Sequence, residues 1–98
     1  MGAFNTLHVT SPVTGQPIRI QFKYGVRRQY DYRIGERIAF QAEVRLADTR
    51  VTLVGGCTEY PKSADEPEHY EIRFEYGFAT SIRAISEDEY DQLEIGRL

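Results

Sequence analysis

Two short turns carry side chains at the spacing of a metal-binding knuckle. Ser11-Pro-Val-Thr-Gly15 and Tyr60-Pro-Lys-Ser-Ala64 both follow the outline Cys-Pro-x-Cys-Gly, with oxygen atoms where that outline has sulfur. Structural zinc needs four ligands in two close pairs, and these ligands are normally thiolates and imidazoles. Hydroxyl groups are poor zinc ligands, so the sequence predicts no metal site and no cofactor.

The soft side chains are few, namely Cys57, His8 and His69. Cys57 follows Gly55 and Gly56, and a glycine turn before a thiol can expose a nucleophile. A functional thiolate needs a neighbouring base and an electropositive setting, whereas the residues that follow Cys57 are rich in Asp and Glu. We therefore expect a protein that is not an enzyme. A redox or metal protein centred on Cys57 is a rival interpretation.

Charge is distributed unevenly along the 98 residues, whose net charge is −3. Residues 1–56 hold eight Arg or Lys against four Asp or Glu, a net of +4, and residues 57–98 hold four against eleven, a net of −7. The two halves can attract each other within the fold, or the acidic half can bind a basic partner. On the second interpretation the partner-binding residues are Glu59, Tyr60, Asp65, Glu66, Glu68, Glu71 and Glu75.

A pair of arginines, Arg27 and Arg28, lies between Tyr24 and Tyr30. Arginines beside aromatic rings can bind phosphate and stack on bases. Against this, the negative net charge opposes approach to a polyanion, and the basic stretch is short. A small nucleic-acid-binding module that uses Arg27, Arg28 and the neighbouring tyrosines is therefore the alternative function.

Apolar and polar residues alternate in two similar stretches, residues 18–25 and 70–77, which both end in Tyr-Gly. Period two is typical of a strand with one buried face. In the second stretch we expect Tyr70, Ile72, Phe74 and Tyr76 to point inward. We expect strands at residues 6–10, 18–24, 30–34, 37–40, 51–54, 69–76 and 80–85. Residues 57–68 are expected to form a loop, and residues 41–50 fit either a strand or a helix.

Near residue 86 the strict alternation of apolar and polar residues ends. Ser86-Glu-Asp-Glu89 is a capping-box pattern, and its acidic first turn suits the helix dipole, so we expect a helix over residues 87–95. No apolar run approaches the roughly 20 residues that span a bilayer, and no secretory signal precedes the first strand. One cysteine cannot form an intramolecular disulfide. These features favour one cytoplasmic domain, residues 1–98, without a membrane contact.

Several short motifs resemble those of a known group of proteins. They are Met1-Gly-Ala-Phe-Asn-Thr6, the turn from Ser11 to Gly15, Gln21-Phe-Lys-Tyr-Gly25, Tyr30-Asp-Tyr-Arg-Ile-Gly35 and the turn at Tyr60. In these motifs the chain resembles small bacterial zinc-ribbon-type proteins, which are found in prophage and polymorphic-toxin neighbourhoods. The resemblance implies a degenerate two-knuckle, zinc-ribbon-like antiparallel β domain from which the zinc-ligand cysteines are lost, and an immunity-like role.

The expected fold is therefore mainly β, with one helix at the carboxyl end. The expected function is that of a non-catalytic binding protein, an immunity or inhibitor protein that neutralises a partner toxin. The segment from Glu59 to Glu71 would occlude the basic active-site cleft of the toxin, while Tyr60 supplies desolvated contact area. The sequence leaves open the identity of the partner, the oligomeric state and the role of Cys57.

Overall fold

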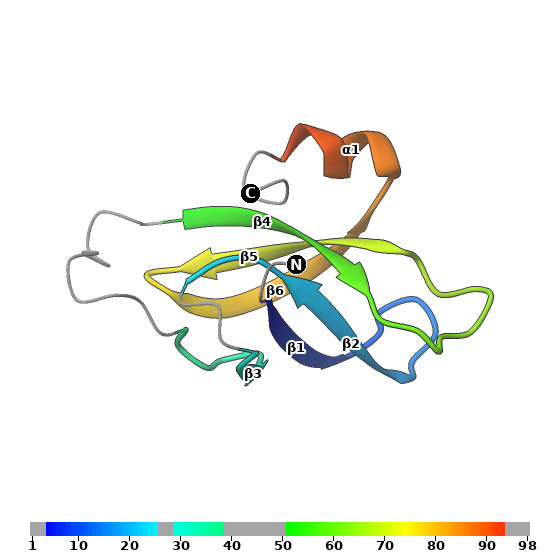
Figure 1. The fold of residues 1–98 in the computed structure, drawn as a ribbon, viewed down its shortest axis with the longest axis horizontal. Helices are drawn as coiled ribbons and strands as arrows, with labels where there is room; N and C mark the ends of the chain where they lie inside the picture. Colours follow the sequence, from blue (N-terminus) through cyan, green and yellow to red (C-terminus); the bar gives the residue numbers. More distant parts are fainter. Residues whose placement is uncertain (1–3, 26–28, 39–50, 94–98) are drawn as a thin grey trace.

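The alternating stretches of the sequence form one strongly curved sheet (Figure 1). The computed structural model describes residues 4–25, 29–38 and 51–93. Its elements are β1 (Asn5–Thr10), β2 (Pro17–Phe22), β3 (Asp31–Arg33), β4 (Val51–Thr58), β5 (His69–Glu75), β6 (Phe78–Ile85) and α1 (Glu87–Gln92). Neighbouring strands follow the order β3-β1-β2-β4-β5-β6. The fold is mainly β, as predicted, and takes the form of a six-stranded curled half-barrel with one short helix.

The sheet departs from the predicted antiparallel arrangement at one strand, because β3 pairs in parallel with β1, while the other pairs are antiparallel. β1 and β2 form a hairpin in which Asn5 lies opposite Phe22, so the chain leaves β2 beside the start of β1. It then crosses to the other edge of β1 and enters β3 in the same direction. The buried Asn5 side chain holds this crossing, because it donates to the Tyr24 carbonyl at 2.9 Å and accepts from the Tyr30 N–H at 3.3 Å.

Residues 35–38 bridge the two edges of the sheet at one end. The Gly35 N–H donates to the Ala79 carbonyl at 2.7 Å, and the Ile38 N–H donates to the Gly77 carbonyl at 2.9 Å. Of the strand predicted at residues 37–40, the structure shows one bridge, between Arg37 and the first residue of β6. Residues 39–40 and the ambiguous residues 41–50 lie outside the described part of the chain.

The core fills the inside of the curve and includes residues of both stretches in which alternation predicts a buried face. Its fully buried members from β1, β2, β4 and β5 are Leu7, Ile20, Val54, Tyr70, Ile72 and Phe74. Phe22 and Phe74 also meet ring to ring, with centroids 5.5 Å apart. Burial of side chains of this size contributes about 1.5–3 kcal/mol each.

Tyr76 does not belong to this core, although the alternation predicts it. Its side chain is 52 % exposed, and both Tyr76 and Gly77 have positive φ, at 52° and 83°. Two successive residues with positive φ form the tight turn that suits the twist of a hairpin. The chain therefore reverses at Tyr76, and β5 ends one residue earlier, at Glu75.

Two further boundaries differ from the sequence prediction. β4 does not stop at Gly55 and Gly56 but continues through them to Thr58, because both glycines pair with β5 and are buried. The predicted helix is present as α1, with the predicted capping box at Ser86 and Glu89, but it ends at Gln92 rather than at residue 95. In the described residues, no helix has the length and apolar character that crossing a membrane requires.

Candidate functional site

The turn between β1 and β2 is organised by a buried hydroxyl group. The Ser11 Oγ accepts hydrogen bonds from the backbone N–H groups of Val13 and Thr14, both at 3.1 Å. It also lies 3.2 Å from the Tyr70 hydroxyl, which comes from the opposite half of the sequence. The turn that outlines a metal knuckle is therefore held by hydrogen bonds to its own serine, a geometry in which Ser replaces a backbone acceptor.

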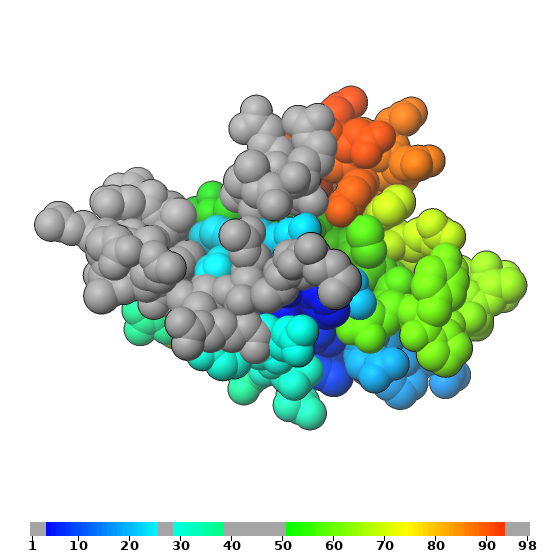
Figure 2. Space-filling view, in the orientation of Figure 1, coloured from blue at the N-terminus to red at the C-terminus, as the bar shows by residue number. Residues whose placement is uncertain are grey.

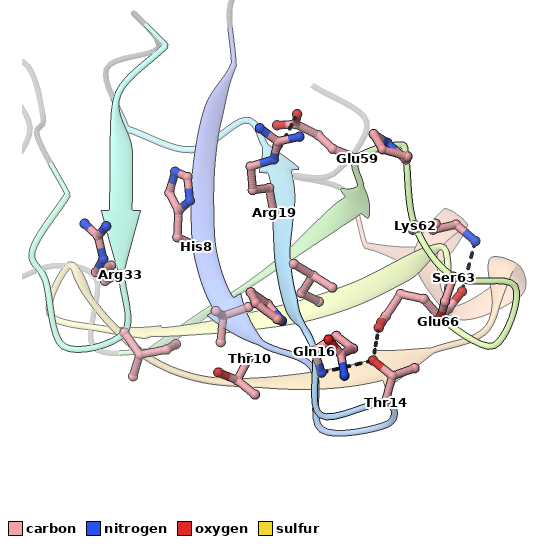
Figure 3. Close-up of a pocket in the computed structure, with 15 residues that line it drawn as sticks. His8, Thr10, Thr14, Gln16, Arg19, Arg33, Glu59, Lys62, Ser63 and Glu66 are labelled. Atoms are coloured by element: carbon pink, nitrogen blue, oxygen red, sulfur yellow. Dashed lines mark hydrogen bonds and ion pairs between the residues drawn. The ribbon is translucent and has the colours of Figure 1, made fainter.

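Glu66 lies at the centre of this contact. Only 3 % of the residue is exposed, and its carboxylate accepts hydrogen bonds from the Thr14 hydroxyl, at 2.9 Å, and from the Tyr70 hydroxyl. Because Tyr70 donates its single proton to Glu66, the Ser11 hydroxyl donates in turn to the Tyr70 oxygen. The buried carboxylate thus links the β1–β2 turn to the loop between β4 and β5 (Figure 3).

The environment keeps Glu66 ionised. Burial acts to raise its pKa, but hydrogen bonds from Tyr70 and Thr14 and the charge of Lys62 act in the other direction, and the pKa lies below its ordinary value. Burial, followed by the hydrogen bond to Glu66, raises the pKa of Tyr70 to about 12. Sequence analysis predicted that Glu66 contacts a partner. In the free protein the carboxylate is buried and faces inward, and its contact with a partner stays a prediction.

The loop joining β4 and β5, residues 59–68, projects at one end of the molecule and exposes several of its other side chains (Figure 2). Tyr60 is 67 % exposed, and its hydroxyl donates to Glu68 at 2.9 Å, which raises the pKa of Tyr60. Asp65 and Glu68 are also exposed. Three of the predicted partner-binding residues, Tyr60, Asp65 and Glu68, therefore share one exposed loop.

Hydrogen bonds join the two ends of the 59–68 loop to each other. The Thr58 N–H donates to the Glu68 carbonyl at 2.9 Å, and the Thr58 hydroxyl donates to the Pro67 carbonyl at 2.7 Å. Further along, the Lys62 Nζ donates to the Glu66 carbonyl at 3.0 Å. With the Glu66 side chain anchored as well, this loop has one defined conformation to present.

The remaining predicted acidic residues are engaged elsewhere in the sheet. Glu71 on β5 pairs with Arg83 at 3.1 Å, and Arg83 also reaches Glu89 of α1 at 3.3 Å. Glu75, at the far end of β5, pairs with Arg73 at 3.1 Å. All of these pairs lie within residues 57–98, so they do not represent attraction between the two halves of the chain; the pair of Arg19 with Glu59 does join the halves. Glu71 and Glu75 do not join the surface formed by Tyr60, Asp65 and Glu68.

Glu59 belongs to a groove beside the loop, which sequence analysis did not predict. The groove has a volume of about 1120 Å³ and runs from the end of β3, across the β1–β2 hairpin, to the 59–68 loop. Arg19 lies on its wall 3.7 Å from Glu59, and Lys62 comes from the loop itself. The sequence shows that Arg19 alternates with apolar neighbours, but the strand register that gathers these residues is not readable from it.

Cys57, His69 and Tyr90 form a second cluster, on the face that α1 covers. Cys57 and His69 are direct partners across β4 and β5, with 3.8 Å between Sγ and Nδ1. The His69 ring stacks on Tyr90, at 4.4 Å between centroids and 19° between planes. Burial, followed by a hydrogen bond to Cys57, raises the pKa of Tyr90 to about 12. His8, the other candidate base, instead bonds Asp31 at 2.8 Å.

Chelation is expected to leave the protein unchanged, because the described residues contain no group of three His, Cys, Asp or Glu side chains placed to hold a metal. Thermal unfolding of freshly purified protein with and without EDTA checks this. The two melting temperatures should agree within error. The variant Cys57→Ser, which removes the only thiol of the chain, should likewise melt at the same temperature with and without EDTA. Stoichiometric zinc released together with loss of the fold would contradict this prediction.

Arg27 and Arg28 lie outside the described residues, so nucleic-acid binding through this pair stays a prediction. Comparison of the chain with protein-family models, with curated proteins and with solved structures finds no match. The 59–68 loop and the groove beside it are therefore the features from which a function can be inferred.

Proposed function

We propose that this chain is a non-catalytic binding protein, an immunity or inhibitor protein that neutralises a partner toxin through the 59–68 loop. The observation that carries the proposal is the combination of exposure and anchoring in this loop. Tyr60, Asp65 and Glu68 face outward, while Glu66, between them, is buried and bound to Tyr70 and Thr14. A loop that is ordered before binding loses little conformational entropy when it meets its partner.

The exposed side chains suit a basic cleft. Tyr60 offers a large rigid ring with a polar tip, which is typical of the few residues that dominate an interface. Asp65 and Glu68 add two carboxylates near it, and such charges steer a basic partner and speed association. A toxin that acts on nucleic acid has a basic active-site cleft, which the acidic loop would enter in place of phosphate groups.

A relation to degenerate zinc-ribbon proteins is part of the same proposal. In such a protein, two knuckles are joined through a shared zinc ion. Here the turn at Ser11 and the loop that contains Tyr60 and Ser63 are joined through the Glu66 carboxylate, which accepts from Thr14 of the first turn. The mixed sheet, in which β3 runs parallel to β1, is the feature that the relation leaves unexplained.

Partner capture is expected to depend on Tyr60. The immobilised protein should retain one partner from a host lysate, and the purified partner should lose its activity when the protein is added. The variant Tyr60→Ala should weaken the complex by about 2 kcal/mol, which is about 30-fold in Kd. The double variant Asp65→Lys with Glu68→Lys should slow association about tenfold at low salt, with less effect at high salt.

Glu87→Lys with Asp88→Lys is the matched control, because it makes the same change of charge at two exposed residues of α1. This control should retain the wild-type association rate and full inhibition. Equal loss in both double variants would mean that only net charge matters. Inhibition that survives both Tyr60→Ala and the loop charge reversal would place the binding surface elsewhere and contradict the proposal.

A further inference from the structure

Three side chains that carry or can gain positive charge stand in one row across the sheet. His8 of β1 lies directly opposite Arg19 of β2 and, on its other side, directly opposite Arg33 of β3. Directly opposed residues of neighbouring strands project from the same face. Figure 3 shows the three side chains side by side on their strands, and Lys62 lies beyond Arg19 on the 59–68 loop, with its amino group toward Glu66.

The nearby carboxylates neutralise part of this charge. His8 bonds Asp31 at 2.8 Å, and the Arg19 Nε is 3.7 Å from Glu59, with half of the arginine side chain exposed. Lys62 donates to the backbone carbonyl of Glu66, and its charge helps to keep the Glu66 carboxylate ionised. Arg33 makes no ion pair with any residue in the described part of the chain. The positive charge that remains available in the groove therefore lies at Arg33 and, in part, at Arg19.

The groove combines this charge with apolar surface. Val9, Ile18 and Ile34 line it together with the row, and its volume of about 1120 Å³ exceeds the 300–1,000 Å³ typical of small-molecule pockets. Its residues come from three strands, a turn and a loop, so the groove is long and open rather than enclosed. A ligand that matches it is extended, negatively charged and partly apolar.

We propose that the groove binds an acidic, extended peptide segment of a protein partner. The carboxylates of the segment pair with Arg33 and Arg19, and its apolar side chains contact Val9, Ile18 and Ile34. Arginine suits this role because its guanidinium group binds a carboxylate through two parallel hydrogen bonds. If the segment belongs to the partner of the proposed function, the interface carries both signs of charge, which fixes its orientation.

The test uses a synthetic peptide, acetyl-Asp-Val-Glu-Leu-Glu-Val-Asp-amide, followed by NMR with the isotope-labelled protein. Its addition should shift the backbone signals of His8, Arg19 and Arg33 more than those of β6. The variant Arg33→Glu should weaken binding about tenfold, because an attraction becomes a repulsion. Arg73→Glu is the matched control: it reverses the charge of an exposed strand arginine outside the groove and should leave the affinity unchanged.

Two further probes carry four charges each and decide between ligand classes. A peptide with lysine at every acidic position should not bind, and a thymidine pentanucleotide should bind more weakly than the acidic peptide. Tighter binding of the pentanucleotide would overturn the proposal in favour of nucleic acid. Equal weakening by Arg33→Glu and Arg73→Glu, or the absence of shifts at the row, would overturn it as well.

The proposal for the groove and the proposed function of the loop can be contradicted separately. Tyr60 does not line the groove, so Tyr60→Ala should bind the acidic peptide with wild-type affinity. Loss of peptide binding in Arg33→Glu with partner capture intact would confirm the groove and leave the loop as the main contact. Normal peptide binding with no capture of any toxin would contradict the proposed function alone.

Discussion

Replacing Glu66 by Gln is expected to destabilise the fold by about 3 kcal/mol, because a hydrogen bond to a charged group contributes about 1.5–3 kcal/mol and this carboxylate accepts two, from Thr14 and Tyr70. Gln has nearly the same volume, so the loss is not that of packing. The Tyr70 and Thr14 hydroxyls would face a neutral amide that offers one acceptor oxygen in place of two. Urea unfolding followed by circular dichroism measures the difference.

Glu68→Gln is the control, because the Glu68 side chain is exposed and, within the described contacts, bonds only the exposed Tyr60. It should change stability by less than about 0.5 kcal/mol. Equal stabilities for Glu66→Gln and the wild type would mean that the buried carboxylate does not hold the turn and the loop together. Stability would then come from the sheet alone.

The same carboxylate makes stability depend on pH. The pKa of Glu66 is lower in the folded protein than its ordinary value of 4.5, so the unfolded chain binds the proton more readily. Its contribution is therefore fully present above pH 4.5 and is lost as the pH falls through the folded pKa. Urea unfolding between pH 3 and pH 7 should show this loss in the wild type. Glu66→Gln should show a flatter profile over the acid range.

A methyl group at Gly56 is expected to destabilise the protein by about 2–3 kcal/mol, the usual range for overpacking a core. A Cβ there would lie 2.5 Å from the Ile20 Cγ2 and 3.0 Å from the Gln21 carbonyl oxygen. Ile20 is fully buried and Gln21 presents backbone, so neither can withdraw without moving β2. The change Gly56→Ala is therefore expected to lower the urea midpoint strongly.

Gly55→Ala provides the comparison, since this neighbouring glycine faces the other side of the sheet. A Cβ there would lie 2.8 Å from the Tyr90 ring, which belongs to the terminal helix and is only half-buried. The ring can move with α1, so we expect a smaller loss than for Gly56→Ala. The reverse order of the two stabilities would show that α1 is held more rigidly than the pairing of β2 with β4.

The elements of the fold were largely predictable because local patterns specify them. Alternation at Ile18–Phe22 and Tyr70–Phe74 predicts two core strands, and the capping box at Ser86 predicts the start of α1. The direction of β3 was not predictable, since it depends on hydrogen bonds from Asn5 to residues about 20 positions away. The course of β4 through Gly55 and Gly56 depends on neighbours that need room, which no local pattern encodes.

The candidate site was predictable only in part, for a similar reason. Acidic composition indicates the 59–68 loop but does not separate Glu66, which is buried, from Asp65 and Glu68, which are exposed. That separation depends on Tyr70 and on the turn at Ser11, about 50 positions earlier in the chain. The row of Arg33, His8 and Arg19 depends on strand register, which the sequence of any one strand does not contain.

The bridge between residues 35–38 and the β5–β6 turn also orders events during synthesis. β1, β2 and β3 leave the ribosome first and can pair with each other, because all three lie in the first third of the chain. Their apolar face stays uncovered until β5 and β6 emerge, since the closing hydrogen bonds need Gly77 and Ala79. The nascent chain is therefore expected to remain open, and exposed to self-association, until β5 and β6 have been synthesised.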